Sequence, residues 1–308
     1  MKFQSRLSLR RETEDAVHDL CVDLKSFAPD LAMVFASHHF GPEFDDLVGG
    51  IYQQINCRNL IGCTGESIVG PTAEIENQPA IALWVAKLPG VRVLPFVVDQ
   101  EDVAGFGQDA AAWRERLGTL DQDPASIIIL PDPFTVDVQA CIDALDTTYP
   151  QATTVGGMAS GATGPGQNRL FLNDQTIRRG MVGVSLTGDI AVSAVVSQGC
   201  RPGGNPYLIA KAEENFIQEL GGRPAYAVLQ ELYKSSEASV QALMRKGLHV
   251  GRLIDEHRRD LNVGGFLVRN MMGVREDQAI AVGDYLRPGQ TVQFQVHETA
   301  RYCWYSRE

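Results

Sequence analysis

Two glycine-rich segments follow predicted strands and are the first candidates for a binding site. The first consists of Gly62, Cys63, Thr64, Gly65 and Glu66, and the second runs from Gly156 and Gly157 through Gly166. Glycine permits positive φ angles and close approach, so such turns at strand ends can present backbone N–H groups to an anionic ligand. Neither segment is a P-loop, because no Gly-Lys-Ser/Thr sequence follows. The alternative is that the glycines only make turns.

Cys63 could act as a nucleophile, with His38 or His39 as its base. The alternative is a small inert hydrophobe, which is the commoner role of a cysteine beside a buried strand. The sequence has no C-x-x-C pair, no H-E-x-x-H motif and no carboxylate cluster of metal-binding spacing. It therefore predicts no metal and no cofactor.

Charged side chains offer possible anchors for a small ligand. Glu66 could hold an ammonium group, and Arg201 and Arg269 could each hold a carboxylate through the planar guanidinium fork. The alternatives are a solvated loop residue for Glu66 and structural ion pairs for the arginines. Opposite charges beside backbone donors would suit an amino acid.

The overall charge limits the classes of partner. The chain has 308 residues, with 27 Lys and Arg against 38 Asp and Glu, which gives a net charge of −11. This charge repels a phosphate backbone and an anionic membrane surface, so neither is an expected partner. The N-terminal residues contain no signal-peptide pattern, and the apolar run Ala80–Leu88 is too short to span a bilayer. We expect a cytoplasmic protein.

Strands and helices alternate along the chain. Leu31–Ala36 and Asn59–Cys63 are predicted strands, joined through a predicted helix over Phe44–Ile55. Pro79–Leu88 and Val91–Val98 are predicted to form a hairpin at Pro89-Gly90. A β-meander is predicted over Leu170–Leu172, Met181–Leu186 and Ala191–Val196. The other main predictions are helices over Thr13–Leu24, Ala110–Leu117, Val136–Leu145, Ala225–Tyr233 and Val240–Lys246, and strands over Ser126–Leu130, Thr153–Val155, His249–Ile254 and Val292–Val296.

This pattern predicts an α/β protein, with α+β as the alternative, built from mixed parallel and antiparallel sheets in two sequential halves. The linker-like segment Gln198–Pro206 (QGCRPGGNP) is the candidate boundary between the halves.

The motifs together resemble the FIST domain, a sensory module named for F-box and intracellular signal-transduction proteins. Segments that resemble its N-terminal half are LAMVFAS (31–37), NLIGCTGESIVG (59–70), PAIALWVAKLPGV (79–91), TTVGGMASG (153–161) and SQGCRPGG (197–204). Segments that resemble its C-terminal half are ENFIQELGGRPAYAVLQEL (214–232), GFLVRNMMGV (265–274) and AIAVGDYLRPGQTVQFQV (279–296).

The polar residues 1–30, with their helical pattern over Thr13–Leu24, are predicted to form an N-terminal helical extension. The resemblance implies a FIST N-terminal domain over 31–200 and a FIST C-terminal domain over 201–308. It also implies a bacterial-type signalling input module that binds a small ligand, such as an amino acid or a small carboxylate, and has no enzymatic activity of its own. The signal would pass to a signalling protein on a separate chain. A Cys63-dependent enzyme and a ligand-free interaction scaffold are the alternatives.

One departure concerns the C-terminus. The family continues beyond the last predicted strand into a further strand pair and a Gly-Glu-Ile-Gly-Pro-like turn, whereas this chain ends in Cys303–Glu308. We therefore expect the FIST C-terminal domain to be incomplete.

Overall fold

The structure is a computed structural model that describes residues 1–194, 199–254, 256 and 265–297. It consists of two compact units, Met1–Ala194 and Val195–Glu308, and each is described by itself. The predicted boundary between residues 200 and 201 lies six residues beyond the one observed. The ending Cys303–Glu308 lies outside the described residues.

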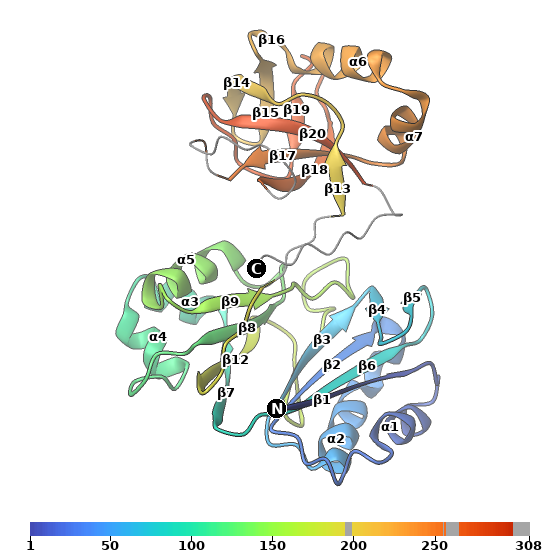
Figure 1. Ribbon diagram of the computed structural model, residues 1–308, viewed down its shortest axis with the longest axis vertical. Coiled ribbons are helices and arrows are strands. Elements are labelled where there is room, and N and C mark those ends of the chain that lie inside the picture. Colours follow the sequence, from blue (N-terminus) through green and yellow to red (C-terminus); the bar gives the residue numbers. More distant parts are fainter. Residues whose placement is uncertain (195–198, 255, 257–264, 298–308) are drawn as a thin grey trace. The chain divides into compact units, whose positions relative to one another are not determined.

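Unit 1 contains two main sheets, and the first of them has six strands (Figure 1). Its order is β1-β6-β2-β3-β10-β11, in which only β2 and β3 are parallel. The strands are β1 (Lys2–Ser8), β2 (Leu31–Ser37), β3 (Leu60–Gly65), β6 (Ile81–Lys87), β10 (Leu170–Leu172) and β11 (Gln175–Ile177). Helices α1 (Thr13–Cys21) and α2 (Phe44–Ile55) cover one face, where Leu20, Leu47 and Ile51 join a core with Val34 and Phe171. The 3-10 helix η1 (His38–Glu43) leads into α2.

A four-stranded sheet forms the second half of unit 1, in the order β7-β12-β8-β9. The strands are β7 (Val91–Val98), β8 (Ser126–Pro131), β9 (Thr153–Gly156) and β12 (Met181–Gly188), and only β8 and β9 are parallel. Helices α3 (Gln100–Phe106), α4 (Ala110–Arg116) and α5 (Val138–Thr148) accompany this sheet. Trp113 and Leu145 on these helices share a core with Ile127 and Met181.

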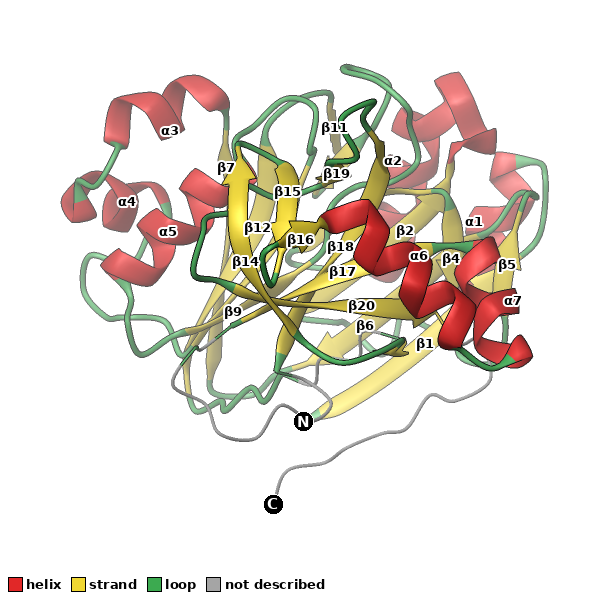
Figure 2. Ribbon diagram, turned by 90° about the horizontal axis from the view of Figure 1, so that it is seen from above, coloured by secondary structure: helices red, strands yellow, loops and turns green. Residues whose placement is uncertain are grey.

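The two sheets of unit 1 pack face to face. Ile61, Cys63 and Leu170 of the first sheet share a buried cluster with Val182 and Val184 of the second. Because helices cover the outer faces, unit 1 has four layers, and Figure 2 shows α3, α4 and α5 on the opposite side from α1 and α2. The short strands β4 (Ser67–Val69) and β5 (Glu74–Glu76) form a separate ribbon.

Unit 2 is built on a ring of antiparallel strands. The ring runs β20-β14-β15-β19-β18-β17 and closes because β17 also pairs with β20. In addition, β13 pairs with β20 and β16 pairs with β15. The strands are β13 (Cys200–Pro202), β14 (Tyr207–Glu213), β15 (Phe216–Leu220), β16 (Arg223–Pro224), β17 (Leu248–Leu253), β18 (Phe266–Val274), β19 (Ile280–Val282) and β20 (Thr291–His297). Helices α6 (Ala225–Ser235) and α7 (Ala238–Lys246) contribute Val228 and Met244 to its core.

The predicted fold class is confirmed, since helices accompany mixed sheets. The predicted hairpin at Pro89-Gly90 is wrong: β6 belongs to the first sheet and β7 to the second, and the chain crosses between them at Gly90, whose φ is +79°. The predicted meander is wrong for the same reason, because β10 and β12 lie in different sheets and 191–194 form no strand. Residues 195 and 196 lie outside the described part of the chain.

The predicted helical extension over residues 1–30 needs a correction. Residues Lys2–Ser8 form a strand that pairs along its whole length with Ile81–Lys87, so the N-terminal residues complete the first sheet. Alternation of exposed and buried positions is weak in this edge strand, which is why its sequence shows no clear period. Helix α1 follows where the amphipathic pattern predicted it.

Candidate functional site

The segment Gly62–Gly65 is the end of strand β3 and not a turn. Gly62 lies opposite Val34 in the parallel pair, and a Cβ atom at Gly62 would lie only 2.0 Å from the Val34 carbonyl oxygen. Gly156 in β9 repeats this arrangement, since a Cβ there would lie 1.9 Å from the carbonyl oxygen of Ile129. Both glycines are therefore required by strand pairing.

Cys63 is buried between the two sheets. Burial raises the pKa of its thiol to about 12, so the thiol is neutral near pH 7 and lacks the thiolate that a nucleophile requires. His39 Nδ1 lies 3.2 Å from Ser37 Oγ, and the rings of His38 and His39 stack with centroids 4.1 Å apart. The pKa of His39 is lowered, first by burial and then by His38 and Arg11.

Thr64 is the residue at which the two glycine-rich segments meet. Its carbonyl oxygen accepts hydrogen bonds from the backbone N–H groups of Ser160 (3.1 Å) and Gly161 (3.3 Å). Its own N–H donates to the carbonyl of Arg169 (2.8 Å), and its hydroxyl oxygen accepts from the Arg169 N–H (3.0 Å). The hydroxyl thus takes the place of the carbonyl in the ladder toward β10, which frees the carbonyl to hold the other segment.

We call the contact of Thr64 with Ser160 and Gly161 the junction. A chain of hydrogen bonds between buried polar side chains lies next to this junction. The Thr64 hydroxyl donates to Asn168 Oδ1 (3.1 Å), and Asn168 Nδ2 donates to Asp132 Oδ1 (2.9 Å) and to the carbonyl of Ala159 (3.3 Å). Asp132 also accepts from the hydroxyl of Thr135 at 2.8 Å. Thr64, Asn168 and Asp132 are at most 1% exposed, so these bonds are made away from water, where breaking one is costly.

Sequence reasoning missed Asp132, Ser160 and Asn168. One signal pointed to Asp132, because a carboxylate directly after the apolar strand Ser126–Pro131 must find partners or reach solvent. Asn168 lies 36 residues further along in an irregular loop, and no spacing rule connects it with Asp132.

Glu66, Gly156 and Gly157 are exposed beside the junction. The N–H of Glu66 donates to the Ser160 hydroxyl (3.2 Å), and the N–H of Gly157 donates to the carbonyl of Ile129 (3.3 Å). These backbone donors are thus used within the protein, contrary to the expectation that they would be open to an anion. A Cβ at Gly157 would meet nothing within 4 Å, so space remains above this glycine.

The two predicted arginine anchors lie in unit 2. Arg201 lies in β13 opposite Val296 of β20. Arg269 lies in β18, and its Nε is 3.8 Å from Asp284 Oδ2, the same oxygen to which Arg252 Nε donates at 3.0 Å. Arg269 is therefore part of an ion-pair group, as the structural alternative predicted.

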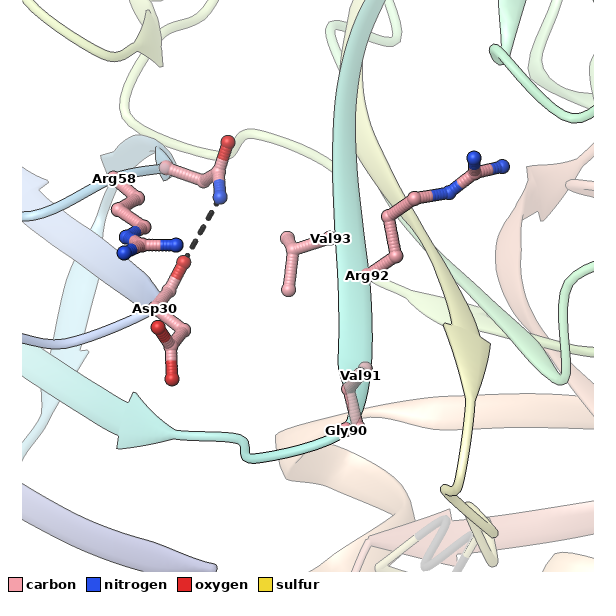
Figure 3. Close-up of a pocket in the computed structure, with 7 residues that line it drawn as sticks. Asp30, Arg58, Gly90, Val91, Arg92 and Val93 are labelled. Carbon is pink, nitrogen blue, oxygen red and sulfur yellow. Dashed lines mark hydrogen bonds between the residues drawn. The ribbon is translucent and has the colours of Figure 1, made fainter.

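A cavity of about 430 Å³ in unit 1 lies at the opposite ends of the strands (Figure 3). Its lining includes Asp30 and Arg58, which precede β2 and β3, and Val93 at the start of β7. The Asp30 carboxylate already accepts from Lys87 Nζ (3.2 Å) and the Leu88 N–H (2.8 Å). A second cavity, of about 600 Å³, lies between α1 and α2. Neither cavity is lined by the glycine-rich segments.

Within residues 1–194, 199–254, 256 and 265–297, no group of three or more His, Cys, Asp or Glu side chains is arranged to hold a metal ion. None of the helices in those ranges has the length and apolar character needed to cross a membrane.

Comparison with known proteins identifies the family. The model of the FIST N domain matches residues 30–223, more than half of the chain. An uncharacterized protein of Mycobacterium tuberculosis (strain H37Rv) is 35% identical over 293 residues, which cover 95% of this chain and 74% of that protein. An uncharacterized protein of Mycobacterium bovis is 34% identical over 279 residues, which cover 90% and 70%. The chain belongs to the FIST family, whose members are generally sensory and signal-transduction modules.

Proposed function

We propose that this protein is a sensory module that binds a small ligand, an amino acid or a small carboxylate, where β3 and β9 end. The observation that carries the proposal is the pair of hydrogen bonds from Ser160 and Gly161 to the Thr64 carbonyl. They join two segments that are about a hundred residues apart in sequence at the carboxyl ends of two parallel strand pairs, β2/β3 and β8/β9. Strand ends of this kind are where open α/β sheets usually bind ligands.

The arrangement of rigid and exposed groups supports this location. The polar chain of Thr64, Asn168 and Asp132 fixes the backbone beneath, while Glu66 and Gly157 remain exposed above it. A site whose backbone is fixed in advance loses little conformational entropy on binding. In this proposal Gly62, Cys63, Gly65 and Gly156 shape the site through strand pairing, and Thr64, Glu66 and Gly157 border the ligand. A signalling protein on a separate chain receives the signal.

Thermal unfolding in the presence of amino acids and small carboxylates tests the proposal. A ligand present at a hundredfold its Kd stabilises the folded state by about 2.7 kcal/mol. The proposal expects at least one compound of these two classes to raise the unfolding temperature in a concentration-dependent way. It is refuted if none of them does so at any concentration tested.

A matched pair of glycine variants locates the site. Gly157→Leu places a side chain in the open space above the junction, whereas Gly105→Leu places one on the exposed surface of α3, where a Cβ also meets nothing within 4 Å. We expect Gly157→Leu to abolish the ligand-induced shift and Gly105→Leu to retain it. A full shift in Gly157→Leu would place the ligand elsewhere.

A further inference from the structure

Arg169 lies at the same strand end as the proposed site. Its backbone is bonded to Thr64 on both sides, through the Thr64 N–H and the Thr64 hydroxyl, at 2.8 and 3.0 Å. Glu66 follows Thr64 by two residues and is fixed through its N–H to Ser160. A guanidinium and a carboxylate are therefore carried by backbone segments that touch.

Neither side chain forms an ion pair within the part of the chain that the structure describes. Nη1 of Arg169 donates to three neutral acceptors, the carbonyls of Gly166 (2.8 Å), Gln167 (3.2 Å) and Asn168 (2.8 Å). Ion pairs with oppositely charged groups are formed by other arginines of unit 1, such as Arg92 with Asp121, but by neither Arg169 nor Glu66 among the described residues. Among the described residues, neither the Arg169 guanidinium nor the Glu66 carboxylate is therefore held in an ion pair.

A second arginine adds to the positive charge. β10 and β11 pair with Leu170 opposite Ile177, so Arg169 and Arg178 come opposite each other at the open end of this hairpin. Like charges at such positions repel. The pKa of Arg169 is lowered, first by burial and then by Arg178, while Asp45 acts in the opposite direction. A guanidinium nevertheless stays protonated, so an anion bound here would relieve the repulsion.

We propose that Arg169, supported by Arg178, holds the carboxylate of the ligand and that Glu66 holds its ammonium group. The inference rests on the proposed function and narrows it, because a small carboxylate alone would leave Glu66 unpaired, whereas an α-amino acid pairs both charges. The planar guanidinium fork suits a carboxylate. In this assignment Arg169 replaces Arg201 and Arg269, which belong to unit 2.

Calorimetric titration with a series of L-amino acids, each compared with its decarboxylated amine and its deaminated acid, tests the assignment. Arg169→Gln should weaken amino-acid binding by about tenfold to a hundredfold, the range for a lost hydrogen bond to a charged group, and leave binding of the amine unchanged. Glu66→Gln should weaken amino-acid binding similarly and leave binding of the deaminated acid unchanged. Arg10→Gln, at an exposed arginine of unit 1, should change neither.

Arg169→Lys separates recognition from folding. It keeps a cation that can reach the carbonyls of the 166–168 loop but lacks the fork, so the ligand-free unfolding temperature should be retained while affinity for the carboxylate falls. If Arg169→Gln and Arg169→Lys bind every probe as the wild type does, the assignment is wrong, and the proposed function stands as long as Gly157→Leu still abolishes binding. If no amino acid or carboxylate binds the wild type, the proposed function fails and this inference with it.

Discussion

Replacing Asn168 with alanine tests whether the buried polar chain holds the junction together. The change removes the hydrogen bond to the Asp132 carboxylate, which is worth about 1.5–3 kcal/mol, and neutral bonds to Thr64 and Ala159, each worth about 0.5–1.5 kcal/mol. These contributions are not additive, so we expect a loss in the free energy of unfolding of about 3–5 kcal/mol. This is a large part of the roughly 5–15 kcal/mol that stabilises a typical domain.

Urea unfolding followed by tryptophan fluorescence measures this loss in unit 1. Trp84 and Trp113 lie in unit 1, and a Trp304→Phe background removes the third tryptophan of the chain. Gln151→Ala, at an exposed position of the same unit, serves as the control and should change the free energy of unfolding by less than about 0.5 kcal/mol. If Asn168→Ala also stays within about 0.5 kcal/mol of the wild type, the reasoning about this chain is wrong.

The pH dependence of stability in an Asn168→Asp variant is a second test of the contact between residues 168 and 132. The substitution places a second carboxylate within hydrogen-bond distance of the first, which raises the apparent pKa of the pair in the folded state above that of an unfolded aspartate. A raised folded-state pKa contributes stability below the unfolded pKa and loses it as pH rises. Asn168→Asp should therefore gain stability relative to Asn168→Ala as pH falls from neutral, and an unchanged difference would contradict the explanation.

Three further predictions follow from the geometry. Gly161→Ala would place a Cβ 2.7 Å from Thr64 Cβ and should destabilise unit 1 by about 1–3 kcal/mol, whereas Gly157→Ala should be nearly neutral, both measured by urea unfolding. Thiol labelling at pH 8 should modify half-buried Cys200 before Cys63, because a pKa of about 12 keeps the Cys63 thiol protonated. A Cys303→Ser background removes the cysteine outside the described residues. Labelling of Cys63 before Cys200 would support the alternative of a Cys63-dependent enzyme. Burial and then His297 lower the pKa of His249 from 6.5, so unit 2 should lose stability as pH falls below about 6.5, and His249→Asn should flatten this dependence in pH-resolved thermal unfolding.

Local periodicity predicted the elements well and their partners poorly. The apolar spacing over Phe44–Ile55 predicted α2 with its observed bounds, because the buried face of a helix has apolar residues every three or four positions along the sequence. The turn at Pro89-Gly90 was also real. Its flanking strands nevertheless join different sheets, since β7 pairs with β12, about ninety residues later in the chain. A turn signal says that the chain bends, not which strand will be its neighbour.

Some residues of the proposed site were already candidates from the sequence. The sequence singled out Thr64, Glu66 and Gly157, and the structure brings the segments that carry them together through hydrogen bonds. It misread Gly62 as a turn residue, because the close approach that excludes a side chain comes from the Val34 carbonyl of a neighbouring strand. Asp132 and Asn168 were out of reach, since a contact between a strand end and an irregular loop leaves no period in the sequence.

The hydrogen bonds that Thr64 makes to Ser160, Gly161 and Arg169 affect how cooperatively this part of unit 1 unfolds. Residues 157–169 contain no regular strand or helix, and a loop of this length would ordinarily open before the sheets do. The amides of Ser160, Gly161 and Arg169, however, are bonded to a residue of β3, so their hydrogen exchange requires that the sheet edge itself open. The loop therefore belongs to the same folding unit as β3, and a ligand that stabilises the loop would slow exchange in the strands beneath it.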